Sequence, residues 1–594
     1  MVRPAPSMRR PHLHLAYRAP KEKRLIAPYV APQWVVHPRA NLEQAKALGA
    51  ELGIPLLAAQ ALVTRGVTDT ESARLFLEPT LDQLHDPFLL KGLDLAVERI
   101  EGAIRNQEPV LIFGDYDVDG ITSTYLLTSV LRSLGARAEY RIPHRTRDGY
   151  GLSIEAIDKA HAAGIKLVVT VDCGITAVEP VRRALDLGID TVITDHHEPA
   201  AVLPEARAIV NPHQPGCTYP FKQLAGVGVT YKLVQALLRG GGTGPQATDY
   251  LDIVAIGTIA DVVPLVGENR ILARAGLARI AGTPRLGLRA LIEVAGLSGR
   301  EITSGHVAFV LAPRINAAGR MGNAEQGMHL LLSREADEAR ACAESLEEDN
   351  QRRREADEQV LIEASDLVTR ELHWPDCSSI LLWSDRWHPG VIGIVASRLV
   401  ERYQRPTVLV AIQGERGRGS GRSLPGLDLN ALLNQCSDLL DAHGGHAFAA
   451  GLTVRPDRLP ALRERLEGLV REQLSADRFV PRLTIDAEAR LGECNMPLIQ
   501  CLERMSPHGL DNPEPVFAAR GVTLENVTTV GGGKHLKVRL RDATGVAEAI
   551  GFGLAERATG VRAGSVVDVA FVPSRNEWRG ETQVQLRLKD LRAQ

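Results

Sequence analysis

The chain has 594 residues, and 69 Lys and Arg against 72 Asp and Glu leave a formal net charge of −3 at pH 7. Hydrophobic residues make up 44% and charged residues 24%, which excludes a largely disordered chain, collagen and a small disulfide-stapled protein. No apolar run reaches the ~18 residues that cross a bilayer, so we expect no membrane association. At roughly 150 residues per domain, the length predicts several structural units.

The first 40 residues differ in composition from the rest. They hold eight Lys and Arg and one acidic residue, Glu22, among frequent prolines. Such a segment is typical of disorder, so we predict a disordered basic leader over residues 1–40. An N-terminal helical segment, 41–100, follows, with helices expected over 42–52 and 70–77.

From residue 110 short apolar runs alternate with helical patterns. Strands are predicted over 110–114, 138–142, 167–171 and 190–194, with helices over 122–134, 154–163 and 178–187 between them. This alternation predicts βαβ units and a parallel sheet. Ligand sites in such sheets form beyond the carboxyl ends of the strands.

Acidic and imidazole side chains follow three of these strands, and one more follows an apolar helix over 253–260. In chain order they are Asp115, Asp117, Asp119, Asp172, Asp195, His196, His197 and Asp261. Taken singly, each cluster is typical of a turn or a helix N-cap. At equivalent ends of one sheet, however, the carboxylates would repel one another unless cations neutralised them. The pattern therefore predicts a metal site.

The ligand types indicate which metal is bound. Carboxylates with imidazole and no thiolate suit Mn²⁺ or Mg²⁺ better than structural zinc. Five or more candidate ligands are too many for one ion with open positions, and are typical of two ions about 3.5–4 Å apart that share a carboxylate. Phosphoester hydrolysis is the reaction class that such a pair favours.

A long segment without Gly or Pro, 333–374, separates this part from a second α/β pattern. A helix over 335–373 would be ~58 Å long at 1.5 Å per residue. Its apolar positions do not keep a heptad, so a spacer helix between two domains is favoured over a coiled coil.

The second α/β pattern has strands over 379–383 and 407–412 and a helix over 391–403 between them. Three segments rich in small residues lie here: His388-Pro389-Gly390, a basic glycine loop over 416–423, and Gly444-Gly445-His446. Glycines allow close approach to a ligand and arginines bind phosphate, although a flexible surface loop is the alternative for 416–423.

The C-terminal region is rich in predicted strands, over 517–522, 536–540, 547–552, 566–571 and 583–588. Five short strands predict a small barrel of the OB type. Phe552, Phe571 and Trp578 are candidates for stacking on bases, with a place in the core as the alternative for Phe552 and Phe571. Trp578 lies in a polar segment and is the better candidate for a contact.

Several motifs together resemble the DHH phosphoesterase superfamily, and within it the single-strand-specific DNA exonucleases. They are GDYDVDG at 114–120, VDCG at 171–174, DHH at 195–197, GTIADVVPL at 257–265, APRINAAGRM at 312–321 and GGH at 444–446. The resemblance covers almost everything after residue 40. It implies an α/β protein with a parallel-sheet DHH domain (101–332), a long spacer helix (333–374), a smaller α/β DHHA1 substrate-binding domain (375–468) and an OB-like β-barrel (469–594).

The resemblance also implies roles for single residues. Asp117, Asp119, Asp172, His196 and Asp261 resemble the ligands of a dinuclear site, with Asp172 as the bridge. His197 resembles a residue that supports the site or contacts the scissile phosphate, and with Asp119, Asp172 and His196 it is expected to be catalytic. The implied substrate-binding residues are Arg314, Asn316, Arg320, His388, Ser420, Arg422, Ser423, Gly444, Gly445, His446 and Trp578.

One position departs from the pattern of the superfamily. Related pyrophosphatases place a histidine four residues before the first Asp of the DxD motif, where this chain has Phe113. Asp115 is the candidate replacement, and whether it is a ligand stays open. The departure argues against pyrophosphatase activity.

The function implied is a metal-dependent 5′ to 3′ exonuclease that degrades single-stranded DNA to 5′-mononucleotides in DNA repair and recombination. Two divalent cations, Mn²⁺ or Mg²⁺, are the expected cofactors. The expected partners are single-stranded DNA, a single-strand-binding protein and a helicase, for a monomer in the bacterial cytoplasm that is associated with the nucleoid.

Two alternatives remain. The first is a DHH phosphodiesterase that acts on short oligonucleotides or cyclic dinucleotides, although such relatives usually lack the C-terminal barrel. The second is a catalytically inactive DNA-binding scaffold, in which several carboxylates should have been lost.

Overall fold

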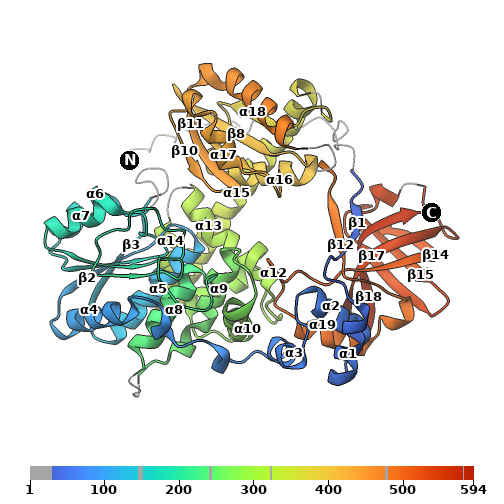
Figure 1. Ribbon diagram of the computed structural model, residues 1–594, viewed down its shortest axis with the longest axis horizontal. Helices are drawn as coiled ribbons and strands as arrows, with labels where there is room; N and C mark the ends of the chain where they lie inside the picture. The colour runs from blue at the N-terminus through green and yellow to red at the C-terminus, as the bar shows by residue number, and fades with distance from the viewer. Residues whose placement is uncertain are drawn as a thin grey trace, which may run out of the picture. The chain divides into compact units, whose positions relative to one another are not determined.

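The computed structural model describes residues 30–144, 151–239, 244–321, 324–372, 374–474, 479–558, 560–578 and 581–594 (Figure 1). The chain divides into two compact units. The smaller consists of Met1–Val30, Leu361–Ser384 and Ala396–Ser475, and the larger of Ala31–Val360, Asp385–Val395 and Ala476–Gln594. Among the described residues, no single helix is long and apolar enough to cross a membrane.

A five-stranded, fully parallel sheet lies in the larger unit. Its order is β3 (Arg137–Arg141), β2 (Pro109–Phe113), β4 (Leu167–Val171), β5 (Asp190–Thr194) and β6 (Ala208–Val210). The predicted parallel sheet is confirmed, whereas β6 was not predicted.

Helices cover both faces of this sheet (Figure 1). Alternate strand residues such as Val110 and Ile112 pack in one core with α4 (Leu93–Arg105), α5 (Val118–Ser133) and α8 (Gly226–Leu237). The intervening residues, such as Leu111 and Phe113, pack in a second core with α6 (Ile154–Ala162) and α7 (Val178–Asp186). Both faces are apolar because a parallel sheet is buried on both sides.

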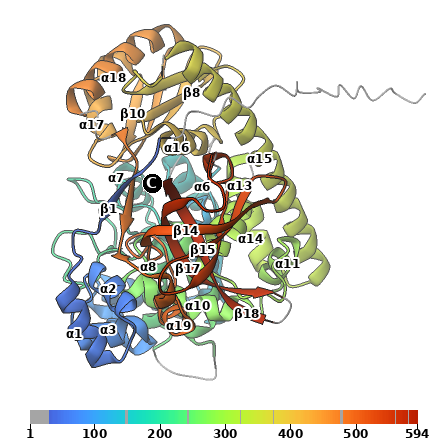
Figure 2. The ribbon, with the colours of Figure 1, turned by 90° about the vertical axis from the view of Figure 1, so that its right-hand side faces the viewer.

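Further helices extend the first of these cores. They are α9 (Leu251–Ala260), α10 (Gly267–Ile280), α11 (Leu286–Val294), α12 (Ser304–His306), the π-helical segment η4 (Val307–Leu311), α13 (Ala312–Met321) and α14 (Glu325–Leu332). The predicted long helix is confirmed as α15 (Ala336–Glu371), a single helix of 36 residues (Figure 2).

The prediction of a disordered leader over residues 1–40 needs correction at its end. Strand β1 (Gln33–Val36) pairs in parallel with β12 (Arg482–Ile485). Trp34 anchors the strand, because its Nε1 donates to Asp590 Oδ2 at 2.7 Å and the guanidinium of Arg592 lies 4.3 Å from its ring. Residues 1–29 of the leader lie outside the described residues.

The predicted N-terminal helices form, as α1 (Leu42–Leu52), α2 (Leu56–Thr64) and α3 (Thr70–Leu77). Their buried residues do not join the core of the parallel sheet. They pack instead against α19 (Met496–Arg504) and the C-terminal barrel in one hydrophobic cluster (Figures 1 and 2). Segments at the two ends of the chain therefore share a core.

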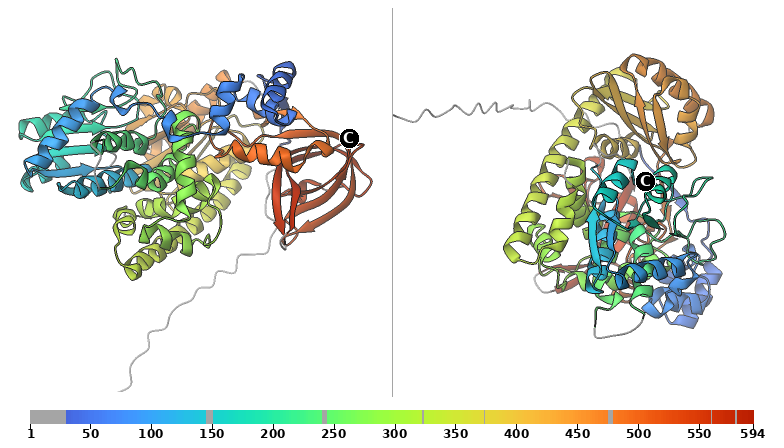
Figure 3. Two further views of the ribbon diagram at one scale, coloured as in Figure 1. Left: turned by 90° about the horizontal axis from the view of Figure 1, so that it is seen from below. Right: turned by 90° about the vertical axis from the view of Figure 1, so that its left-hand side faces the viewer.

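The C-terminal strands form the predicted OB-like barrel (Figure 3). β13 (Ala487–Glu488) is followed by β14 (Phe517–Val530), β15 (His535–Arg541), β16 (Val546–Gly551), β18 (Glu581–Ala593) and β17 (Val566–Trp578), and pairing of β14 with β17 closes the barrel. Phe571 is fully buried and thus belongs to the core, whereas Phe552 is 61% exposed. The side chain of Trp578 lies outside the described residues.

The smaller unit contains a five-stranded mixed sheet. Its order is β10 (Ala442–Gly445), β11 (Ala449–Val454), β9 (Arg416–Arg422), β8 (Thr407–Gln413) and β7 (Ile380–Ser384), with α16 (Ile392–Tyr403) linking β7 to β8. Helices α17 (Leu429–Asn434) and α18 (Leu459–Gln473) complete it.

Strand β9 corrects the prediction of a basic glycine loop over 416–423. Arginine or serine alternates with glycine there, and this period of two fits a strand. A Cβ on Gly419 would lie 2.6 Å from Leu452 Cδ1, and one on Gly421 would lie 2.6 Å from Leu429 Cδ2. The glycines therefore let the packed face of the sheet close, and Ser420 and Arg422 fall on the opposite face.

Candidate metal centre

The first acidic motif forms a tight turn between β2 and α5. Asp117 is the N-cap of α5, where its Oδ1 accepts a hydrogen bond from Gly120 N at 3.1 Å. A Cβ on Gly120 would lie 2.5 Å from the Asp115 carbonyl oxygen, so the turn closes only around glycine. This close fold brings Asp115, Asp117 and Asp119 to one end of the sheet.

Asp119 is held by the N-terminus of a second helix. Its two carboxylate oxygens accept hydrogen bonds from Gly226 N at 2.7 Å and Val227 N at 2.8 Å, in the first turn of α8. Burial, followed by the negative charge of Asp117, raises the pKa of Asp119 to about 7. The carboxylate is therefore fixed in position but costly to ionise without a cation.

Asp172 follows β4 in a backbone conformation that is rare for non-glycine residues, with φ of 59°. It is buried, and a Cβ on Gly226 would collide with its carboxylate. Burial and then the charges of Asp119 and Asp117 raise its pKa well above the usual value. Strained residues of this kind are concentrated at functional sites.

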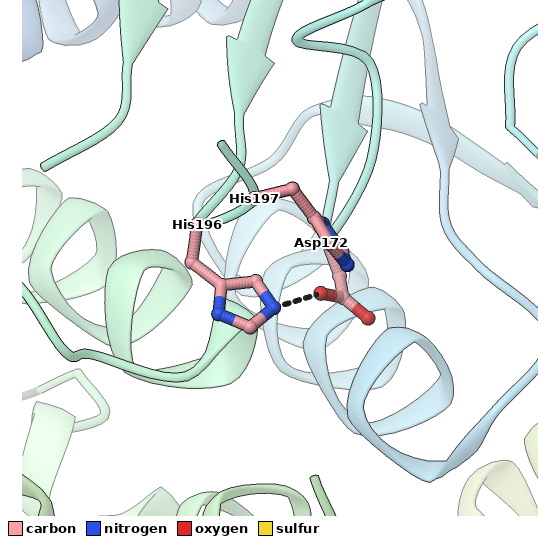
Figure 4. Close-up of side chains that lie close together, drawn as sticks. All are labelled: Asp172, His196 and His197. Carbon is pink, nitrogen blue, oxygen red and sulfur yellow. Dashed lines mark ion pairs between the residues drawn. The ribbon is translucent and has the colours of Figure 1, made fainter. Parts of the chain in front are cut away.

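His196 lies between two of the carboxylates. Its Nε2 is 3.2 Å from Asp172 Oδ1, and Figure 4 shows the ring turned toward that carboxylate. The same nitrogen is 3.6 Å from Asp261 Oδ2, at the end of α9. Burial, and then the charge of His197, lower the pKa of His196 to about 4. The imidazole is thus neutral at pH 7, which is the form that binds metals.

The structure brings all six predicted metal ligands together. Three groups each have one potential ligand atom per residue within 4.8 Å of the others: Asp115, Asp117 and Asp172; Asp119, His196 and Asp261; and Asp172, His196 and His197. Asp172 and His196 each belong to two of these groups, and of the two only the carboxylate of Asp172 has two oxygens with which to bridge two ions. Asp115 lies with Asp117 and Asp172, so it stays a candidate ligand.

The donor atoms fit divalent cations. Within the described part of the chain, the buried atoms Asp172 Oδ1, Asp261 Oδ2 and His196 Nε2 have no hydrogen-bond partner. Burial and the charge of Asp119 also raise the pKa of Asp261 well above its usual value. Buried carboxylates that repel one another and lack donors are stabilised by cations. Oxygen and imidazole donors suit Mn²⁺ or Mg²⁺.

Asp195, the first residue of the DHH triplet, is a functional residue without a role predicted from the sequence. Its Oδ1 accepts from His196 N at 2.8 Å and lies 2.7 Å from His197 Nδ1, while its Oδ2 accepts from Ile175 N at 2.9 Å. Burial opposes ionisation of Asp195, but the bond with His197 keeps its pKa below the usual value. Burial likewise lowers the pKa of His197, yet the same bond raises it overall. The adjacency of Asp195 to His196 and His197 in the sequence was the signal that could have predicted this supporting role.

We expect Asp195→Asn to lower kcat about 10- to 100-fold with little change in KM, because outer-shell partners of a metal site contribute on this scale. The variant should also lower the pKa of His197, which an NMR titration of the histidines measures. Asp190→Asn, at the other end of β5, is the matched control. A normal rate, or an unchanged His197 pKa, would contradict the role of Asp195.

The predicted substrate residues of α13 are largely occupied by contacts within the protein. Arg314 is 6% exposed, and its Nε lies 2.5 Å from Glu347 Oε2 of α15. It therefore ties α13 and α15 together, and contact of Arg314 with a substrate stays a prediction. Asn316 Oδ1 accepts from Val118 N at 3.1 Å and so supports the first acidic motif. Arg320 Nη1 donates to Gly390 O at 3.3 Å.

His388 is exposed, and its Nδ1 accepts a hydrogen bond from Gly390 N at 3.1 Å. The short His-Pro-Gly segment is thus folded on itself, with the imidazole ring at the surface.

Three predicted phosphate-binding residues of the smaller unit lie on strands of one sheet, and a fourth directly follows one of these strands. Ser420 and Arg422 of β9 stand opposite Gly451 and Ala449 of β11, and Gly444 of β10 also pairs with Gly451. Arg422 Nη1 donates to Ser420 Oγ at 3.2 Å. His446 is exposed just beyond β10.

The other two predicted residues of this segment have internal roles. Ser423 is buried and donates to Leu427 O at 2.9 Å. Gly445 has φ of 140°, and a Cβ there would lie 2.5 Å from Ala449 O. Both shape the turn around His446.

Comparison with known proteins identifies three domains. Residues 109–258 match the DHH family, N-terminal domain, residues 377–472 match the DHHA1 domain, and residues 485–590 match the RecJ OB domain.

Whole proteins are similar as well. The single-stranded-DNA-specific exonuclease RecJ of Bacillus subtilis is 40% identical over 94% of this chain and 70% of that protein. The RecJ of Escherichia coli is 36% identical over 93% of this chain and 98% of that protein. A crystal structure of RecJ from Thermus thermophilus in complex with Mn²⁺ matches with a TM-score of 0.81 and 34% identity, over 94% of this chain and 79% of that one. The corresponding Mg²⁺ complex matches with a TM-score of 0.76.

Proposed function

The chain belongs to the RecJ family, and on this premise we propose that it is a metal-dependent exonuclease that degrades single-stranded DNA from the 5′ end to 5′-mononucleotides. We place this activity in DNA repair and recombination. The observation that carries the proposal is the convergence of the acidic and imidazole side chains at the end of the parallel sheet.

The proposed ligands divide between two divalent cations, Mn²⁺ or Mg²⁺. Asp115 and Asp117 would hold one, Asp119, His196 and Asp261 would hold the other, and Asp172 would serve both. When bound, such a pair supplies Lewis-acid stabilisation of the charge that develops on the phosphoryl oxygens.

The side chains around the ligands have complementary tasks in this proposal. The bonds from Gly226 N and Val227 N hold Asp119 in place, and the neutral His196 offers Nε2. His197, whose pKa the bond with Asp195 raises, can carry a proton toward the scissile phosphate. General acid groups work best when their pKa is near the operating pH.

The smaller unit supplies the proposed site for the 5′-terminal phosphate. Ser420, Arg422 and Gly444 lie on strands of one sheet, with His446 directly after β10, and a guanidinium with nearby small residues suits a phosphate. The direction of digestion rests on the likeness to the family.

The alternatives are less well supported. A hydrolase for short oligonucleotides or cyclic dinucleotides would not need the barrel that matches the RecJ OB domain. An inactive scaffold would not need six converging ligands. Family likeness alone supports the further proposals of a cytoplasmic, nucleoid-associated monomer that works with a single-strand-binding protein and a helicase.

The test is digestion of one oligonucleotide, labelled at either end, as a single strand and as a blunt duplex. With Mn²⁺ we expect early release of the 5′ label as a mononucleotide, progressive shortening of the 3′-labelled strand, and no reaction in EDTA. The duplex should react much more slowly. Internal cuts, release of the 3′ label first, or equal rates on both substrates would refute the proposal.

A further inference from the structure

A cavity of about 1410 Å³ lies within the larger unit and has no role in the function described so far. Its wall includes Ala260 and Val262, the chain neighbours of the candidate ligand Asp261. It also includes residues of α10, the segment from Glu301 to Phe309, and Arg587 of the barrel. The cavity thus shares a chain segment with the metal centre and has the barrel in its wall.

Three large apolar side chains in this wall are exposed. Val262 is 65% exposed, Phe309 is 78% exposed and Leu510 is 50% exposed. Several exposed apolar side chains on one concave surface are typical of a binding site. Phe309 also stands on η4, a π-helical segment, and such segments are frequent at functional sites.

The backbone at Val262 is strained, with φ of 61° in a β-branched residue. Valine rarely adopts this left-handed conformation, so the surrounding structure must impose it. The strain places an apolar side chain at the surface directly after a metal ligand.

Hydrogen bonds across the cavity hold its walls together. Leu265 N donates to Leu510 O at 2.9 Å, and Ser304 Oγ donates to His508 O at 2.8 Å. Arg270 of α10 is buried and donates to the carbonyl oxygens of Arg504 and Ser506 on the opposite wall. The cavity is thus preformed, which lowers the entropy that a ligand loses on binding.

The charged groups of the wall indicate which part of a nucleic acid fits. Arg504 pairs with Glu78, and Arg587 pairs with Glu514. Arg274 donates to the carbonyl oxygen of Arg504 at 2.7 Å. The wall also contains three glutamates, Glu301, Glu503 and Glu514. They balance these three arginines, so the wall is not strongly cationic and its exposed apolar side chains are the surface that distinguishes it. Such a surface suits the faces of bases, which stack on aromatic side chains whatever the sequence.

We propose that this cavity receives unpaired bases of the DNA strand beside the scissile phosphate, and that Phe309 stacks on one of them. The inference rests on the proposed function and deepens it. Bases in a duplex are paired and stacked on one another, so only a single strand presents free faces to Phe309. The cavity would then contribute to strand selectivity as well as to affinity.

The test compares wild type with Phe309→Ala and Phe309→Trp on single-stranded 20-mers in which a block of three abasic sites is moved along the strand. We expect Phe309→Ala to raise KM about tenfold on the intact strand and Phe309→Trp to restore it. At one position of the abasic block, the KM of wild type should rise by the same factor, and the KM of Phe309→Ala should not rise further. Phe88→Ala, an exposed aromatic of η2 (Pro87–Leu89), is the control.

Bis(p-nitrophenyl) phosphate, a small diester that carries no base, separates this inference from the proposed function. Phe309→Ala should hydrolyse it with Mn²⁺ as fast as wild type, because the ester places no neighbouring base in the cavity. Three results would overturn the role of Phe309. They are a change in KM below twofold on the intact 20-mer, a further rise in the KM of Phe309→Ala at every position of the abasic block, and an equal loss of activity on the small ester. Wild type that digests no single strand would instead refute the proposed function.

Discussion

Replacing Asp119 with asparagine is expected to lower kcat by about 10³-fold or more while leaving the affinity for single-stranded DNA within a few-fold. Two-metal sites contribute several kcal/mol of transition-state stabilisation, and ~4 kcal/mol corresponds to about 10³ in rate. Asparagine has the shape of aspartate but not its charge, so it weakens the cation site without opening a cavity. Its amide group also cannot accept from both Gly226 N and Val227 N, as the carboxylate does.

Single-turnover digestion with excess enzyme measures the chemical step, and fluorescence anisotropy of a labelled strand measures binding. Titration calorimetry should show weaker Mn²⁺ binding in the variant. Asp94→Asn removes an exposed carboxylate from the first turn of α4 and is the control for a change in net charge. Near-normal turnover of the Asp119 variant would remove Asp119 from the ligand set.

The parallel sheet and its metal ligands could be predicted because their signals are local. The run Leu167–Val171 is apolar throughout, as a strand buried on both faces must be, and the structure confirms it as β4. The rule that sites form at the carboxyl ends of parallel strands then predicts that Asp119 and Asp172 meet. This rule applies without knowledge of the distances between the residues. Asp261, in contrast, follows a helix, and its place beside them was implied by the family resemblance.

Contacts between distant segments carried no comparable signal. Helix α2 looks like any apolar helix, and nothing in its pattern shows that it packs on the barrel, where Thr64 hydrogen-bonds to Asp486. The Gly-Arg alternation of β9 was interpreted as a loop, and only the tertiary packing of its glycines shows why it forms a strand. The positive φ of Val262 also could not be predicted, because valine by itself disfavours that conformation.

The roles of some polar residues also could not be predicted, because their type and position fit two roles. Arg314 and Asn316 lie in a motif that suggested contact with the substrate, yet both bond to the protein itself. Polar side chains near an active site can hold its parts in place as well as touch the ligand, and only the partners of each atom distinguish the two roles.

Removing the divalent cations is expected to leave a protein whose thermal stability falls as the pH rises from 6.5 to 8. In the metal-free folded state the pKa of Asp119 is raised to about 7, and those of Asp172 and Asp261 are raised as well. The folded state therefore binds more protons than the unfolded state in this range, so stability decreases with pH. His197, with its raised pKa, acts in the same direction.

His196 has the opposite effect, but in a different range of pH. Its pKa is lowered to about 4 from the usual 6.5, so it makes stability rise with pH mainly below 6.5. Above pH 6.5 the raised pKa values of the carboxylates and of His197 determine how stability changes with pH. Mn²⁺ replaces the protons on the carboxylates, and at a concentration of 100 times Kd it should add about 2.7 kcal/mol. Because cations and protons compete, the gain from a fixed Mn²⁺ concentration should be larger at pH 8 than at pH 6.5.

Calorimetric unfolding in EDTA and in Mn²⁺ at pH 6.5, 7.25 and 8 measures both effects. The Asp119→Asn variant should show a shallower fall of Tm with pH in EDTA, because it lacks one of the groups that titrate, while Asp94→Asn should follow wild type. A metal-free Tm that rises over this range, or a gain from Mn²⁺ that is the same at every pH, would mean that the buried carboxylates ionise without help. Mutual repulsion would then not be what draws cations to the end of the sheet.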